Sequence, residues 1–288
     1  MVVRNEADLL GVNLRYHAAQ GINAFRVVDN GSSDRTPQLL REMARELNVL
    51  WTRDDGPFHQ ADMMTTIARE ASRAGADWIV PIDADEFWSA GSEPLARVLE
   101  RSSAGVIAAD VVNFIQDRGT SGEGPSALLT MTHRVDAPRS SRDQSWSLVE
   151  SRRIAFVEIE YPKKCLFRSS ASLTIVAGAH DAIGAAGPAV NASHVACLHA
   201  PIRSRRVLDA RAEHGRRLIE AGYPPRHGWQ NQRWHQLQTG TWLDEEWRAN
   251  SVRDGYLGDW RTPVVFDPRL RDAVRPMVAA GMQATAPR

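Results

Sequence analysis

Cysteine, lysine and long apolar runs are scarce in this sequence, and each scarcity excludes a class of protein. The two cysteines, Cys165 and Cys197, are too few for a disulfide framework or a cysteine-rich metal site, so a reduced, cytoplasmic protein is expected. The only lysines are Lys163 and Lys164, among 35 basic residues, and we assign no function to this bias. No run approaches the roughly 20 apolar residues of a transmembrane segment. Charges within residues 1–10 argue against a signal peptide.

An excess of one charge sign is also missing. Lys and Arg total 35, and so do Asp and Glu, which gives a formal net charge of zero. Nucleic-acid-binding proteins usually carry a basic excess, so no nucleic-acid partner is expected. The 288 residues, of which 43% are hydrophobic and 24% charged, suit one large globular domain or two smaller ones.

The first half of the chain alternates strand and helix patterns. Helices are predicted where apolar residues recur at helical spacing, and strands where short apolar runs stand between turn residues. The predicted strands cover residues 1–4, 24–29, 48–52 and 77–82, and the predicted helices cover 6–20, 36–47 and 58–74. This order predicts an α/β fold with a mostly parallel sheet and helices on both faces.

The second half has a looser pattern. We expect a short helix at 92–100, a strand at 104–114, a long loop at 116–147, a hairpin within 164–178 and a helix at 202–221, before a tryptophan-rich tail. A loop of that length in a compact domain is usually functional or disordered. The predicted division is a nucleotide-binding half at 1–115, a part at 116–200 that completes the site, and a C-terminal helical region at 201–288.

The strongest chemical signal is an acidic motif at a strand end. Asp83, Ala84, Asp85 and Glu86 directly follow the predicted strand WIVPI. Ligands of open α/β sheets bind outside the carboxyl ends of the strands, where two aspartates one residue apart can face one point. Carboxylate oxygens suit Mg²⁺ or Mn²⁺, which commonly bridge to substrate phosphates. The alternative is an acidic turn that caps the next helix.

A second polar turn, DNGSSD, begins at Asp29, where another strand is predicted to end. The turn-forming tendency of Gly, Asn and Asp explains it without any function. Alternatively, Asp29 accepts hydrogen bonds from a ligand in the same crevice as the acidic motif. Two acidic strand ends in one parallel sheet together favour a nucleoside-diphosphate site.

Several segments, taken in order, resemble glycosyltransferase family 2, and most closely a bacterial branch with a DADEFW-type motif. They are RNEAD, YH and GI, then VVDNGSSDRT and GADWIVPIDADEFW, with weaker matches at KCLFR, GAH and HAPIRS. The resemblance implies a GT-A fold, a nucleotide-sugar donor, a divalent cation (Mn²⁺ or Mg²⁺) and usually inversion at the anomeric carbon. The chain begins later than the family pattern, so a shortened first strand is expected.

The resemblance also implies roles for donor-binding residues. Asp29 and Asn30 would contact the base of the donor, and Val3 and Glu6 would line the same pocket. Arg203, in the HAPIRS segment, could hold diphosphate oxygens through bidentate contacts. The alternative for Arg203 and its neighbour Arg206 is an ordinary solvated helix face.

The cation would be held by side chains from two parts of the chain. The resemblance implies that Asp83 lies near the ribose and a metal-bound water, and that Asp85 binds the cation. His199 could supply a third ligand, or it could cap the following helix. His180 and Asp181 are the rival candidates.

An inverting transfer needs a general base for the acceptor hydroxyl. The acidic pair that many family members carry at a helix start is not found here. Asp181, beside His180, is the first candidate, and Asp143 and Glu150 follow, although each could be an ordinary surface carboxylate. Three tryptophans could stack against an acceptor sugar or could simply pack in the core, namely Trp229, Trp234 and Trp242.

Together these patterns predict a metal-dependent glycosyltransferase. It would move a sugar from a nucleotide-sugar, specifically a UDP-sugar, to a saccharide, an envelope precursor or a small-molecule acceptor. One alternative is a non-catalytic partner protein that binds sugar or nucleotide. A nucleotidyltransferase is a further alternative, but such enzymes usually carry a glycine-rich loop after the first strand, where this chain reads VRNEAD.

Overall fold

The computed structural model describes residues 1–120, 122–139, 145–225, 228–238 and 241–284, and their contacts form two compact units. Unit 1 comprises Met1–Val112 and Pro162–His199, and unit 2 comprises Asn113–Tyr161 and Ala200–Arg288. The chain therefore passes between the units after Val112, Tyr161 and His199. The functional division predicted from the sequence stays a prediction.

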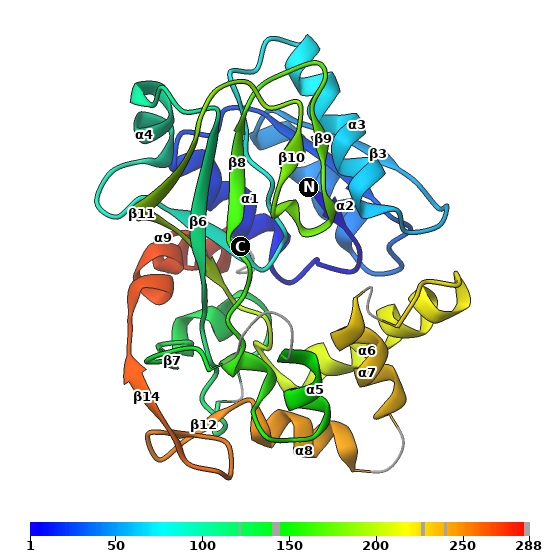
Figure 1. Ribbon diagram of the computed structural model, residues 1–288, viewed down its shortest axis with the longest axis vertical. Coiled ribbons are helices and arrows are strands. Elements are labelled where there is room, and N and C mark those ends of the chain that lie inside the picture. The colour runs from blue at the N-terminus through cyan, green and yellow to red at the C-terminus, as the bar shows by residue number, and fades with distance from the viewer. Residues whose placement is uncertain (121, 140–144, 226–227, 239–240, 285–288) are drawn as a thin grey trace. The chain divides into compact units, whose positions relative to one another are not determined.

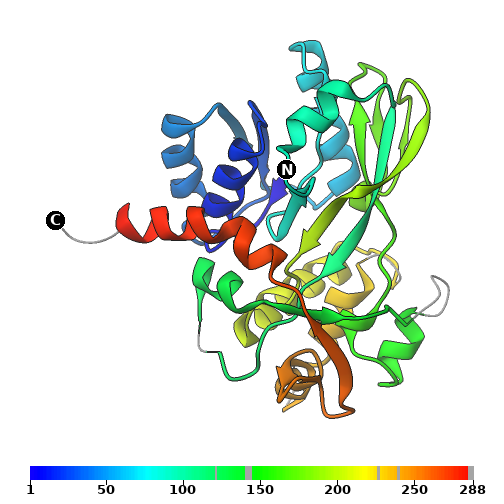
Figure 2. The ribbon, with the colours of Figure 1, turned by 90° about the vertical axis from the view of Figure 1, so that its left-hand side faces the viewer.

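Unit 1 begins with a three-stranded parallel sheet that has helices on both faces (Figure 1). The strands, in the order β1-β2-β3, are β1 (Val2–Val3), β2 (Phe25–Asp29) and β3 (Val49–Arg53). The helices are α1 (Leu10–Ala19), α2 (Thr36–Glu46) and α3 (Gln60–Arg73). Val27 of β2 packs in one cluster with α1 and α2, which lie side by side in Figure 2, and Val28 packs in another with α3. The predicted α/β class is confirmed.

A five-stranded sheet completes unit 1, in the order β4-β8-β6-β11-β5. Its strands are β4 (Trp78–Ile79), β5 (Glu86–Ser89), β6 (Val106–Asn113), β8 (Lys164–Arg168) and β11 (Ala189–His199). The pairs β4·β8, β6·β8 and β5·β11 are antiparallel, so the strand predicted at 77–82 does not join the parallel sheet. Helix α4 (Leu95–Arg101) lies between β5 and β6 in the chain.

The hairpin predicted within residues 164–178 is wrong. Strand β8 pairs with β4 and β6. Strand β9 (Thr174–Ile175) instead pairs with β10 (Ala182–Ile183), and the short helix η3 (Ala177–Ala179) lies between β9 and β10 in the chain. The physical reason is burial, because the first four residues of β8 are all buried. The backbone N–H and C=O groups of a buried strand need partners along both edges, and β4 and β6 supply them for β8.

A pocket of about 710 Å³ is lined by residues of both sheets of unit 1. Met1, Phe25 and Arg26 line one side, and residues 76–82 line the other. Strand β1 has only two residues, which pair with Val28 and Asp29 at the end of β2. The first residues of β2 therefore have no strand beside them on the β1 side. The Met1 ammonium donates a hydrogen bond to the Arg26 carbonyl over 2.8 Å, and burial lowers its pKa to about 5.

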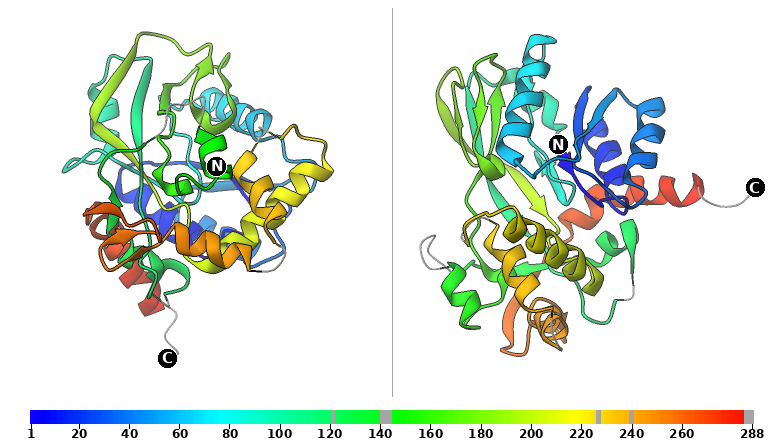
Figure 3. Two further views of the ribbon diagram at one scale, coloured as in Figure 1. Left: turned by 60° about the horizontal axis from the view of Figure 1, so that its bottom comes forward. Right: turned by 90° about the vertical axis from the view of Figure 1, so that its right-hand side faces the viewer.

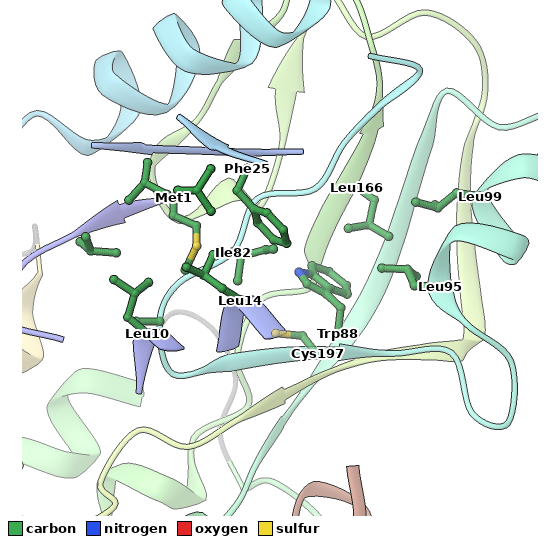
Figure 4. Close-up of a cluster of buried hydrophobic side chains, with 14 of the residues drawn as sticks. Met1, Leu10, Leu14, Phe25, Ile82, Trp88, Leu95, Leu99, Leu166 and Cys197 are labelled. Atoms are coloured by element: carbon green, nitrogen blue, oxygen red, sulfur yellow. The ribbon is translucent and has the colours of Figure 1, made fainter. Parts of the chain in front are cut away.

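The main core of unit 1 surrounds Trp88 (Figure 4). This indole is fully buried, and its N–H donates to the carbonyl of Pro81 over 2.8 Å. Ile82 and Ala84 belong to the same cluster, together with side chains from α1, β2, β8 and β11. Because Ile82 precedes the acidic motif and Trp88 follows it, the core holds that motif at both ends.

Unit 2 contains short helices and a four-stranded sheet. The sheet has the order β12-β13-β14-β7, with β7 (His133–Val135), β12 (Val252–Arg253), β13 (Tyr256–Leu257) and β14 (Thr262–Phe266). The helices are η1 (Gly124–Thr130), α5 (Ser145–Glu150), η2 (Phe156–Glu158), α6 (Arg205–Glu220), α7 (Trp229–Gln236), α8 (Trp242–Ala249) and α9 (Arg269–Ala284). Helices α6 and α7 pack against each other (Figures 1 and 3).

The structure bears on two expectations about this unit, although a stacking role for the tryptophans stays a prediction. The predicted loop at 116–147 contains η1 and β7, so it is not structureless. Trp234 is buried and donates to Glu246 over 3.1 Å, whereas Trp242 is 42% exposed and lies under the guanidinium of Arg152. Within the described ranges, none of the helices is long and apolar enough to cross a membrane.

Candidate functional site

The acidic motif forms a turn that leads directly into β5. The Glu86 N–H donates to the Asp83 carbonyl over 3.1 Å, and the Asp83 N–H donates to Glu86 Oε2 over 3.3 Å. The alternative that this segment caps a helix is wrong, because Glu86 is the first residue of a strand. The turn therefore presents the carboxylates of Asp83 and Asp85 from a short, internally bonded loop.

Lys164, the first residue of β8, places its buried ammonium between the carboxylates of Asp83 and Glu86. Its Nζ lies 2.7 Å from Asp83 Oδ2 and also forms an ion pair with Glu86. Burial alone would lower the pKa of Lys164, but the carboxylates of Asp83 and Glu86 raise it above its ordinary value. On Glu86 burial is the larger effect and raises the pKa, while the ammonium of Lys164 opposes the rise. Lys164 is thus a permanent cation in the turn.

Asp85 faces His199 instead. His199 in β11 is paired with Glu86 in β5, and its Nε2 lies 3.6 Å from Asp85 Oδ2. Both side chains are almost fully buried. Adjacent ligands of one Mg²⁺ or Mn²⁺ ion, each at about 2.1 Å, lie roughly 3 Å apart, so this pair fits two neighbouring coordination positions. In the described part of the chain, no group of three or more His, Cys, Asp or Glu side chains is arranged to hold a metal.

At the end of β2, Asp29 and Asn30 are both completely buried. Asp29 Oδ1 accepts the Ser32 N–H over 3.0 Å, the turn geometry that the first interpretation predicts. Asn30 donates its side-chain N–H groups to the carbonyls of Asp54 and Gly56, over 3.0 and 3.2 Å. Asn30 Oδ1, by contrast, has no partner among the described residues. A buried acceptor of this kind is costly unless a donor reaches it.

Comparison with known proteins decides the family. The family model described as "Glycosyl transferase family 2" matches residues 1–151, which is more than half of the 288 residues. The chain belongs to glycosyltransferase family 2. The predicted family and the GT-A fold class are thereby confirmed, and the protein is a glycosyltransferase. A search of curated proteins finds no match to this glycosyltransferase.

Solved structures similar to this glycosyltransferase include residues 1–349 of Staphylococcus aureus TarS. That structure is 12% identical, with 85% of this chain and 76% of that chain covered and a TM-score of 0.37. TarS in complex with UDP-GlcNAc gives 12% identity, coverages of 85% and 77%, and a TM-score of 0.39. The mannosyltransferase PcManGT from Pyrobaculum calidifontis, in complex with GDP-Man and Mn²⁺, gives 15% identity, coverages of 99% and 74%, and a TM-score of 0.36.

The other residues predicted for unit 1 lie at several positions. Val3 is buried in β1, and its carbonyl accepts the Asn30 N–H over 2.9 Å. The Glu6 N–H donates to Thr36 Oγ1 over 2.9 Å. His180 and Asp181 stand just before β10, and the exposed Asp181 accepts the N–H of the next residue over 2.7 Å. The structure brings Val3 beside Asn30 and His199 beside Asp85.

The candidates of unit 2 stay predictions. Arg203 is buried, and its carbonyl accepts a hydrogen bond from Gln116 over 3.0 Å. Glu150 is exposed at the end of α5. Asp143 lies outside the described residues.

Two residues that contact the acidic turn were not selected from the sequence: Lys164, and Asn13 of α1, whose Nδ2 lies 2.7 Å from the Glu86 carbonyl. Lys164 stands at the start of the strand KCLFR, and a lysine in a buried strand needs an ionic partner. Asn13 lies on α1 between the apolar Leu10 and Leu14, where a polar side chain is unexpected. In both cases the available signal was a polar residue in an apolar pattern.

Proposed function

We propose that this glycosyltransferase moves a sugar from a nucleoside-diphosphate sugar, specifically a UDP-sugar, to a saccharide, an envelope precursor or another small-molecule acceptor. The proposal includes a divalent cation at Asp85 and His199. The observation that carries it is this carboxylate–imidazole pair, whose 3.6 Å separation suits two ligands of one ion. Hexosyl transfer with inversion of the anomeric carbon is part of the proposal.

The turn after β2 is the proposed site for the donor base. Asn30 Oδ1 supports this role, because a base N–H would satisfy its unmet capacity to accept a hydrogen bond. Asp29 would help to fix this turn through its bond to Ser32, 3.0 Å long. Val3 and Glu6, near the end of β1, would line the same pocket.

The acidic turn is the proposed site for the diphosphate. A bound Mg²⁺ or Mn²⁺ supplies a Lewis acid that offsets negative charge on the departing nucleoside diphosphate. Asp85 and His199 would hold the ion, whereas Asp83, already paired with Lys164 at 2.7 Å, would face the ribose. The Lys164 charge lowers the negative charge of the turn, which eases the approach of an anionic donor. Arg203 is a further proposed diphosphate ligand.

Asp181 is the proposed general base, with His180 beside it. Its carboxylate is exposed, so an acceptor hydroxyl can reach it without rearrangement of the core. The carboxylate would take the hydroxyl proton as the oxygen attacks the anomeric carbon and the nucleoside diphosphate leaves. Asp181→Asn should then abolish sugar transfer and leave binding of the nucleotide unchanged.

The first experiment is calorimetric titration with UDP, GDP and dTDP, each with and without Mn²⁺. We expect one nucleotide, UDP, to bind in a Mn²⁺-dependent way and Asp85→Asn to weaken that binding about 10- to 100-fold. The matched control is Asp110→Asn, which removes an exposed carboxylate from β6 in the same unit. Absence of binding with every nucleotide would reject the catalytic proposal in favour of a non-catalytic partner protein.

A further inference from the structure

The acidic turn is fastened to helix α1 by one buried amide. Asn13 is fully buried, and its Nδ2 points at three backbone carbonyls of the turn. The distances are 3.4 Å to Asp83, 3.0 Å to Ala84 and 2.7 Å to Glu86. Since an amide has two N–H groups, the two shorter contacts are the full hydrogen bonds and the third is weak. The carbonyls on both sides of Asp85 are therefore held from one point.

A second side chain of α1, His17, fixes the orientation of that amide. The Trp88 N–H donates to His17 Nε2 over 3.2 Å, so this nitrogen must carry a lone pair. The proton of the neutral ring then lies on Nδ1, which is 3.0 Å from Asn13 Oδ1 and 2.9 Å from the Asn13 carbonyl. The single Nδ1–H is shared between these two oxygens, so Oδ1 faces His17 and the Nδ2 group of Asn13 faces the turn.

This arrangement is not explained by packing alone. The same helix buries Leu10 and Leu14, and a leucine at position 13 or 17 would fill space without two polar groups to satisfy. Burying an amide and an imidazole is favourable only when their hydrogen bonds are made, and here those bonds lead to the turn and to Trp88. Without Asn13, the carbonyls of Ala84 and Glu86 would lose the donor that makes its two short bonds to them.

We propose that Asn13, oriented by His17, is a positioning residue for the cation and diphosphate site. It acts through Asp85, whose main chain it immobilises at Ala84 and Glu86, so that the Asp85 carboxylate is already aimed at His199 before any ligand arrives. Preorganised ligands bind a cation more tightly because less order is lost on binding. This inference rests on the function proposed above.

The test measures Mn²⁺ affinity by electron paramagnetic resonance in the presence of UDP, which needs no knowledge of the acceptor. Asn13→Leu should weaken Mn²⁺ binding about 10- to 100-fold, as loss of outer-shell support does at other metal sites. His17→Leu should weaken it in the same direction. The matched control is Tyr16→Phe, which removes an equally buried hydrogen bond of α1, from the Tyr16 hydroxyl to the Trp88 carbonyl at 2.9 Å. This control should leave the Mn²⁺ affinity within about twofold.

Thermal unfolding of each variant separates positioning from stability. If Asn13→Leu and Tyr16→Phe lose similar stability and only Asn13→Leu loses Mn²⁺ affinity, the inference holds. Unchanged affinity in a folded Asn13→Leu protein would overturn it. If that variant does not fold, the Mn²⁺ affinity and thermal stability of Asn13→Ser and His17→Leu are compared with those of Tyr16→Phe instead. A wild-type protein that binds neither UDP nor Mn²⁺ would overturn the proposed function itself, which is a distinct result.

Discussion

The charge balance of the acidic turn depends on one side chain. Asp83 and Glu86 are both paired with Lys164, whose side chain is 7% exposed, whereas Asp85 is left to face His199. A buried ion pair adds little net stability when it is intact, because desolvation offsets the attraction. Removal of one partner is different, because it leaves buried charge without compensation.

Lys164→Met should therefore destabilise the protein by about 3–5 kcal/mol. Urea denaturation followed by linear extrapolation measures the loss. The adjacent lysine gives the control, because Lys163 is 39% exposed and pairs with the exposed Asp110. Lys163→Met should cost no more than about 1 kcal/mol. Equal losses for the two variants would show that the buried ammonium has no special role.

The same residues mark how much of the site could be predicted from the sequence. The sequence predicts Asp83 and Asp85 because a D-x-D motif after a strand is a local signal, and their role stays a prediction. His199 was also predicted, as a third ligand, but nothing local predicts the ion pair of Lys164 with Asp83, because β8 lies far along the chain. Asn13 was missed because helical periodicity describes an apolar face and not the groups that such a face must satisfy.

At the scale of elements, α1 is the support on which the site is built. It packs beside α2 and contacts β5, the strand that follows the acidic turn. Its position was predicted from sequence spacing, as were α2, α3 and the strands of the parallel sheet. The partners of β8 and β9 were predicted wrongly, as a hairpin of the two, because two short apolar runs separated by a turn look alike whether or not they pair with each other.

Because α1 contacts β5 through a neutral His17, its docking should depend on pH. Burial lowers the pKa of His17 to about 4, from 6.5 in an unfolded chain. Between these values the unfolded chain binds the extra proton, so the stability of the fold falls as the pH falls. At about 1.36 kcal/mol per pH unit, this group alone costs about 3 kcal/mol once the pH has reached 4.

The measurement compares the free energy of unfolding at pH 7 and pH 4.5 in wild type and in His17→Gln. Glutamine can still accept from Trp88 but does not titrate, so the loss of stability should be smaller by about 2–3 kcal/mol. His194→Gln is the control, because this histidine is exposed on β11 and removing it should leave the wild-type loss unchanged. A loss in His17→Gln as large as that of wild type would contradict the assignment.

At the scale of the whole molecule, unit 1 is assembled from two distant stretches of chain. In the order β4-β8-β6-β11-β5, strands from the first stretch alternate with strands from the second. Local patterns gave the first-half strands and helices, but no local pattern specifies which distant strand inserts between two others. The sequence therefore suggested a nucleotide-binding half at 1–115 that residues 116–200 complete, without showing that strands of the second stretch insert into the sheet of the first.

A fragment of residues 1–115 should accordingly fail to fold. Without β8 and β11, the strands β4, β5 and β6 each lose their neighbours in the five-stranded sheet, and Lys164 and His199 are absent from the acidic turn. Isolated strands cannot satisfy their backbone groups, so we expect no cooperative thermal transition and no dispersed amide spectrum. The control is a protein in which a flexible Gly/Ser linker joins Met1–Val112 to Pro162–His199. This control contains the strands of both sheets of unit 1. That protein should unfold cooperatively, and a 1–115 fragment that did so equally well would refute the dependence on the second stretch.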